Sequence, residues 1–369
     1  MRGSGPLIPS TRDAPAHPRP GPAHRRAGTA AGSRPTGRRR RGRGAARAIK
    51  IDPTATIATA EHTILWSRIG SAYEPAQLSK AVELDRLLFE FDGAFRPVSL
   101  LPLMLPAMRR WPRRESSREW LAANDRFRTE VLARLRAEGP LLASDIPDTA
   151  DVARPPDGWS GSNQVAHMLD FLQRQGEVAI VGRQGRHRRW DLAERVYPRD
   201  LPSYEPEEAE RMLNERRLQA AGIVRQGSPW TRVGEAGEPA TIEGMRQKWR
   251  VDPEALAALD NDEGGRAAFL SPYDGMLFDR PRLHDLFELD YVLEQFKPKP
   301  QRKYGYFAHP ILLGDRFVGM LDAQVDREHE VLAVTAVHEF LPFDEDEHDT
   351  VRAEIADLGR WLGVDVPEW

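Results

Sequence analysis

The stretch from Phe269 to Glu339 is the part of this chain that decides how its fold is interpreted. Alternating apolar residues predict strands over 304–312, 316–325 and 331–340, the last two joined as a hairpin. Within the stretch stand five distinctive blocks: Phe-Leu-Ser-Pro-Tyr-Asp-Gly-Met-Leu-Phe-Asp-Arg (269–280), Phe-Glu-Leu-Asp-Tyr (287–291), Lys-Pro-Lys-Pro-Gln-Arg-Lys-Tyr-Gly-Tyr (297–306), Pro-Ile-Leu-Leu-Gly-Asp-Arg-Phe-Val-Gly (310–319) and Ala-Val-His-Glu (336–339).

The order and spacing of these blocks resemble the winged-helix DNA glycosylases of the YcaQ/AlkZ type, which excise alkylated or crosslinked bases. The resemblance covers residues 49–366 and leaves the first 48 residues outside it. It implies an α+β fold, with tandem winged-helix units wrapped around DNA and a C-terminal small β-barrel-like domain. Periodicity alone predicts only a mixed α and β fold with one winged helix.

That winged helix is expected between residues 124 and 200. A helix capped by Asn124 or Asp125 and a short one over 142–146 precede a third helix after Ser160–Ser162. Two strands, 178–181 and 188–192, follow and are joined by a basic turn that predicts a wing. In a chain with an acidic body the wing is a candidate phosphate clamp, although a solvated basic turn is the simpler alternative. Its basic residues are Arg183, Arg186, His187, Arg188 and Arg189.

Further helices are expected over 76–88, over 205–221 and over 345–362, and a short one within 100–108. Together with the resemblance, these elements divide the chain into six parts. They are a disordered Arg/Pro/Gly-rich tail (1–48), the remainder of a first winged-helix unit with the catalytic strand (49–123), a second winged helix (124–200), a third winged-helix-like unit (201–265), the β-barrel-like domain (266–345) and a C-terminal helix (346–369).

Composition narrows the classes of function. The chain has no cysteine, which excludes disulfides, thiolate nucleophiles and iron–sulfur clusters. No stretch has the roughly 18 continuous apolar residues of a membrane span, and no secretory signal is recognisable, so we expect a cytoplasmic protein. We also expect it to be a monomer. His62, His309 and His338 have no partner at metal-ligand spacing. A Gly-rich phosphate loop is also missing, so we expect neither a metal nor a cofactor.

Charge is distributed unevenly along the chain. The 53 Lys and Arg face 56 Asp and Glu, but residues 1–50 contain 12 Arg and one Lys against one Asp. The remaining residues therefore carry 40 basic and 55 acidic side chains, a balance of −15. The tail has too few apolar residues to fold. It is either a basic arm for nucleic acid or, as we favour, the out-of-frame translation of a GC-rich gene.

The catalytic signature of the resembled family is a Gln-x-Gln or Gln-x-Asp pair on its first strand. Here the corresponding residues are Lys50-Ile51-Asp52, followed by Leu-Trp-Ser-Arg-Ile-Gly (65–70). Side chains two apart on a strand share a face, so Lys50 and Asp52 are expected to reach one pocket. The Asp52 carboxylate could stabilise an oxocarbenium-like sugar or deprotonate water. The alternative is that Asp52 only initiates a turn before Pro53.

Lys50 departs from the family pattern. A lysine only donates hydrogen bonds, and we expect it to pair with Asp52. It could also attack the sugar as an amine nucleophile. We favour a third interpretation, in which Lys50 is the last miscoded residue of the tail.

A second basic segment alternates cations with prolines and ends in tyrosines. Basic residues beside aromatics suit a loop that grips the DNA backbone and stacks on an extruded base. A solvated loop that leads into a core strand is the alternative, and Tyr306 could belong to that core. The candidate DNA contacts here are Lys297, Lys299, Arg302, Lys303 and Tyr304.

The sequence thus predicts a DNA glycosylase that hydrolyses the N-glycosidic bond of alkylated or interstrand-crosslinked purines of the N7-alkylguanine type. Its partner would be double-stranded DNA that carries such bases. The alternative is a noncatalytic winged-helix DNA-binding protein or regulator. A third possibility is an enzyme inactivated by loss of its opening helices.

Overall fold

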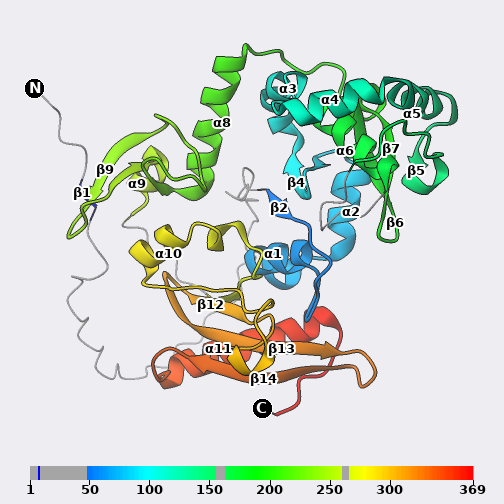
Figure 1. Ribbon diagram of the computed structural model, residues 1–369. Helices are drawn as coiled ribbons and strands as arrows, with labels where there is room; N and C mark the ends of the chain where they lie inside the picture. Colours follow the sequence, from blue (N-terminus) through cyan, green and yellow to red (C-terminus); the bar gives the residue numbers. More distant parts are fainter. Residues whose placement is uncertain (1–6, 9–47, 155–162, 260–265, 369) are drawn as a thin grey trace, which may run out of the picture.

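The computed structural model describes residues 7–8, 48–154, 163–259 and 266–368. Most of the predicted tail, 1–48, and the residues Ser160–Ser162 lie outside these ranges. Within the tail, Leu7–Ile8 form the short strand β1, which pairs in parallel with a strand more than 200 residues later in the chain. Figure 1 shows four small sheets, each accompanied by helices.

The first sheet lies in the middle of the molecule in Figure 1 and has the order β2–β4–β3. Its strands are β2 (Ile49–Lys50), β3 (Leu88–Phe91) and β4 (Ala94–Pro97). Asp92 and Gly93 both have positive φ, of 50° and 67°, which closes the two-residue β3–β4 turn. The accompanying helices are α1 (Ala60–Ile69), α2 (Pro75–Glu83) and α3 (Leu101–Arg109).

Helices α4 (Glu115–Ala123), α5 (Asp125–Glu138) and α6 (Gln164–Gln175) pack around the second sheet. Its order is β5–β7–β6, from β5 (Leu141–Leu142), β6 (Val178–Gln184) and β7 (His187–Leu192). The hairpin predicted over these residues is present, with longer strands and a turn at Gly185–Arg186. Their shared core includes Phe127, Leu135, Met168, Leu169, Leu172 and Trp190.

The short helix α7 (Ala193–Val196) leads to α8 (Pro206–Ala221), a long charged helix that contacts α3. The third sheet follows with the order β1–β9–β10–β8. Its remaining strands are β8 (Ile223–Arg225), β9 (Glu238–Ile242) and β10 (Lys248–Val251), and the short helix α9 (Pro253–Ala257) ends this part.

The fourth sheet contains most of the stretch from Phe269 to Glu339. It is antiparallel, in the order β11 (Ala267–Phe269), β12 (His309–Leu313), β13 (Arg316–Asp326) and β14 (Val331–Glu339). The predicted 316–340 hairpin is confirmed by the β13–β14 register. Helices α10 (Arg280–Phe287) and α11 (Glu345–Leu362) complete this part; the sheet and α11 lie at the bottom of Figure 1, and α10 lies above them.

One apolar core joins the first and fourth sheets. Trp66 of α1 stacks on Phe269 of β11 and contacts Trp361 of α11 at a centroid distance of 5.8 Å. The Trp361 indole also donates a hydrogen bond to the Tyr73 carbonyl oxygen at 2.9 Å. The segment around β2 is therefore held against the C-terminal sheet and cannot be separated from it without exposing this core.

Four structural predictions need correction. The strand predicted over 304–312 begins only at His309, as β12. The helix predicted over 76–88 ends at Glu83, so Leu87 is exposed and Leu88 begins β3. The short helix predicted over 142–146 is instead the end of β5 and a 3₁₀ turn over 143–145. In the described residues the fourth sheet is open, with β11 and β14 at its edges, so strand pairing does not close a barrel.

Candidate active site and DNA-contacting surfaces

Asp52 lies two residues beyond the end of β2, in a turn that its own side chain stabilises. Its Oδ1 accepts a hydrogen bond from the Thr54 backbone N–H at 3.0 Å. Its backbone N–H donates to Oε2 of Glu61 at 3.4 Å, and the Thr59 hydroxyl donates to the other oxygen of Glu61 at 2.8 Å. The turn-initiating role is therefore present, and it fixes the carboxylate while leaving it half-buried.

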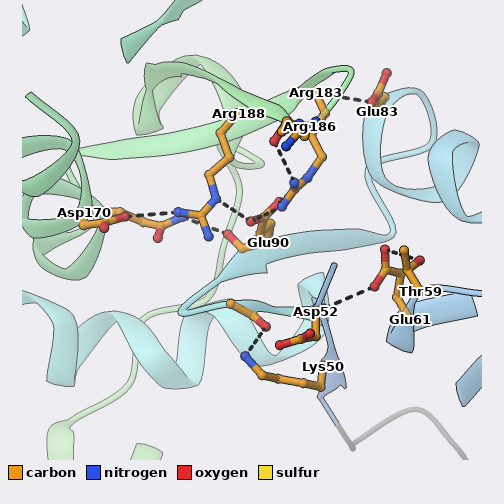
Figure 2. Close-up of polar contacts among 12 residues, drawn as sticks. Lys50, Asp52, Thr59, Glu61, Glu83, Glu90, Asp170, Arg183, Arg186 and Arg188 are labelled. Carbon is orange, nitrogen blue, oxygen red and sulfur yellow. Dashed lines mark hydrogen bonds and ion pairs between the residues drawn. The ribbon is translucent and has the colours of Figure 1, made fainter. Parts of the chain in front are cut away.

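The expected pairing of Lys50 with Asp52 is wrong for the described structure. Lys50 Nζ donates to the Gly93 carbonyl oxygen at 3.3 Å, across the turn of the neighbouring hairpin, and forms no ion pair with Asp52 (Figure 2). The strand ends at Lys50, so the strict alternation assumed from the sequence does not extend to Asp52.

A large cleft lies beside this segment, between α1, α2 and the β6–β7 hairpin, with a volume of about 1390 Å³. Ile51 and Pro53 line it, but Lys50 and Asp52 do not. Glu61, His62 and Arg327 also line the cleft, and Arg327 lies in the turn between β13 and β14. The predicted catalytic residues thus do not line this cleft.

Asp52 is linked to the C-terminal part of the molecule through Thr54 and Tyr273. The Tyr273 hydroxyl donates to Oε1 of Gln295 at 3.1 Å and is also hydrogen-bonded to the Thr54 side chain. Burial raises the pKa of Tyr273, and the negative charge of Asp52 raises it further. The phenol therefore remains a neutral hydrogen-bonding group beside the carboxylate at neutral pH.

The wing contains two kinds of basic residue. Figure 2 shows Arg183 and Arg188 converging on Glu90 of β3, whose side chain is only 1% exposed. Arg183 reaches both Glu90 oxygens, at 2.7 and 2.8 Å, and Arg188 donates to Oε1 at 2.8 Å and to Asp170 at 3.3 Å. These two arginines neutralise a buried acid, so they join β3 to the wing.

The other basic residues of the wing do not contact Glu90, and Arg186 and His187 line the cleft. Arg186 and His187 are exposed at the turn, and Arg189 is half-buried. Among the residues that the structure describes, Arg186 and Arg189 form no ion pair, so their charge is available to a phosphate. The sequence pattern could not separate these cations from Arg183 and Arg188, because Glu90 is almost 100 residues away.

The second basic segment is built around Glu294, which is 6% exposed and which no sequence pattern singles out. Its carboxylate accepts hydrogen bonds from Lys297 Nζ and from the backbone N–H groups of Lys303 and Tyr304. Lys299 and Lys303 are exposed. Tyr304 packs partly into the core beside the C-terminal sheet, whereas Tyr306, the suggested core residue, is exposed.

Arg302 completes this segment: its Nε donates to the Lys297 carbonyl oxygen and its guanidinium lies 5.0 Å from the Tyr306 ring centroid. In the described ranges no group of three or more His, Asp or Glu side chains has the arrangement of a metal site. None of the helices there is both long and apolar enough to span a bilayer.

Residues 45–361 match the family model described as DNA glycosylase AlkZ-like. The match covers most of the chain, which therefore belongs to the AlkZ-like DNA glycosylase family. The fold is also similar to that of the solved Streptomyces sahachiroi DNA glycosylase AlkZ. The TM-score is 0.56 at 16% sequence identity, over 88% of this chain and 91% of the other.

Proposed function

We propose that this chain is a DNA glycosylase that hydrolyses the N-glycosidic bond of alkylated or interstrand-crosslinked purines of the N7-alkylguanine type. Membership of the AlkZ-like family supports the reaction class. The placement of Asp52 supports the site: the Thr54 N–H holds its carboxylate, Glu61 accepts a hydrogen bond from its backbone N–H, and Tyr273 links this turn to the C-terminal part.

Hydrolysis of this N-glycosidic bond requires little more from the protein than one positioned carboxylate. An N7-alkylated guanine is cationic, so when the bond from C1′ to N9 breaks, its electron pair neutralises the departing base. The sugar becomes oxocarbenium-like, and the Asp52 carboxylate stabilises that charge. Water then adds to C1′ and gives its proton to Asp52, which leaves a free base and an abasic site.

For DNA binding we propose the exposed cations of both basic segments. Arg186, His187, Lys299 and Lys303 are exposed and Arg189 is half-buried, and in the described residues none of these five side chains forms an ion pair with a buried acid. The same proposal includes tandem winged-helix units and the division of the chain into six parts. It also includes a cytoplasmic monomer that acts on double-stranded DNA. The helices and hairpin over 125–192 are the elements that fit a winged helix best.

The test is to incubate the full chain with two duplexes, one bearing N7-methylguanine and one bearing an N7-linked interstrand crosslink. Free base is measured by chromatography and uncrosslinked strands on a denaturing gel. Release from either duplex supports the proposal. Salt-dependent binding of both duplexes, with no base released from either, would favour the noncatalytic DNA-binding alternative.

A further inference from the structure

Phe296 is an aromatic side chain left almost entirely in solvent, with 74% of its surface exposed. Single exposed apolar residues are common and usually carry no function. Phe296 differs because both of its neighbours are held by buried or half-buried side chains.

On its N-terminal side, Glu294 ties the loop to itself. Its Oε2 accepts hydrogen bonds from the backbone N–H groups of Lys303 and Tyr304, at 2.7 and 2.8 Å, while Oε1 accepts a hydrogen bond from Lys297 Nζ at 2.9 Å. These bonds draw the two ends of the loop together around Phe296. The ring is therefore presented on a braced loop.

The same loop is linked to the candidate active site. Gln295, directly before Phe296, accepts a hydrogen bond from the Tyr273 hydroxyl at 3.1 Å, and Tyr273 in turn interacts with Thr54 and Asp52. Phe296 thus follows Gln295, which Tyr273 and then Thr54 connect to Asp52, whose carboxylate is proposed to act on the sugar.

The surroundings of Phe296 suit a nucleic acid. Lys299 and Lys303 are exposed in the same loop, and Tyr306, which is 43% exposed, is stacked with Arg302 at 5.0 Å. Cations that follow a phosphate backbone beside aromatic faces that stack on bases are the usual combination at such surfaces.

We propose that Phe296 is a wedge that enters the base stack of duplex DNA and fills the space left when the damaged nucleotide leaves it. This inference rests on the proposed function. This inference concerns a base alkylated on one strand only, such as N7-methylguanine, whose extrusion exposes the bond between C1′ and N9 to Asp52 and costs stacking energy. Apolar side chains inserted between base steps offset such unstacking in other DNA-bending proteins.

The experiment uses a duplex with N7-methylguanine beside 2-aminopurine, whose fluorescence rises when it unstacks. The full chain is compared with Phe296→Ala and Phe296→Trp. The control is Trp230→Ala, which removes another exposed aromatic, at 62%, that is not among the proposed DNA contacts. Affinity, fluorescence change and single-turnover base release are measured for each.

We expect Phe296→Ala to bind the duplex with unchanged salt dependence, to lose the fluorescence rise and to release base about tenfold or more slowly. Phe296→Trp should restore both signals, and Trp230→Ala should match the parent. A fluorescence rise and release rate in Phe296→Ala equal to the parent would overturn the proposal, as would binding by the parent without any rise. If the fluorescence rise depends on Phe296 but the parent releases no base, the result would support the wedge and count against the glycosylase function.

Discussion

At the scale of single residues, Asp52 combines a structural and a proposed chemical role. Its Oδ1 holds the Thr54 N–H, and its backbone is held by Glu61, so the carboxylate has little freedom to move. An asparagine at this position can keep the Oδ1 acceptor and lose only the charge. That makes Asp52→Asn a cleaner test than a truncation to alanine.

Lys50 is engaged with the Gly93 carbonyl oxygen and not with Asp52. We therefore predict that it is not a nucleophile. Borohydride added during the reaction should trap no covalent protein–DNA adduct, and Lys50→Gln should release base at least as fast as the parent. An adduct that is trapped with the parent and absent with Lys50→Gln would contradict this prediction and establish amine catalysis.

At the scale of elements, the wing divides into cations that hold the fold and cations that are available to DNA. Replacing Arg183 with Ala removes a partner from a buried carboxylate. It should lower the free energy of unfolding by about 1.5–3 kcal/mol, the range for hydrogen bonds to charged groups. Arg186→Ala should leave it nearly unchanged. Urea unfolding of both variants measures the difference, and equal stabilities would contradict the division.

The same division predicts the salt dependence of binding. Arg186→Ala with Arg189→Ala should flatten the slope of log affinity against log salt by about 0.9 for each phosphate that the wing no longer neutralises. Arg360→Ala, on α11 far from the wing in Figure 1, is the matched control. If the double variant kept the parent slope, the wing would not bind the DNA backbone.

Elements differ in how far the sequence predicts them. The spacing of Val165, Met168, Leu169 and Leu172 predicts α6, and alternation predicts the β13–β14 hairpin, because these patterns are local. The sequence misplaces the end of α2 because Leu88 continues its apolar pattern, while tertiary pairing places Leu88 in β3. Sequence periodicity does not report long-range contacts, so it could not identify the partners in the site, which are Glu61, Glu90, Tyr273 and Glu294.

At the scale of the whole molecule, the segment around β2 and the C-terminal sheet share one apolar core. These two parts are therefore stabilised together. His309 of β12 is fully buried there, and burial lowers its pKa to about 4. The unfolded chain, with an ordinary pKa near 6.5, binds more protons between these two values. Stability from neutral His309 is therefore complete above about pH 6.5 and is lost as the pH falls toward 4.

This linkage predicts a loss of up to about 3 kcal/mol between pH 6.5 and pH 4 that depends on His309. His309→Phe, which cannot titrate, should show a shallower decline in unfolding free energy across that range. Chemical unfolding at pH 5 and pH 7.5 gives the comparison. A variant with the same pH dependence as the parent would show that other groups cause the acid sensitivity.

The acidic balance of the chain after residue 50 also acts at this scale, because it repels DNA wherever cations are not concentrated. Binding should then depend on a few exposed basic positions, and catalysis on the single carboxylate beside them.

The most direct test of this account is single-turnover release of 7-methylguanine from a methylated duplex by the parent chain and by Asp52→Asn, with affinity measured in parallel. We predict that the parent releases the base and that Asp52→Asn is slower by at least about a hundredfold while binding as tightly. Release by Asp52→Asn at the parent rate would contradict it.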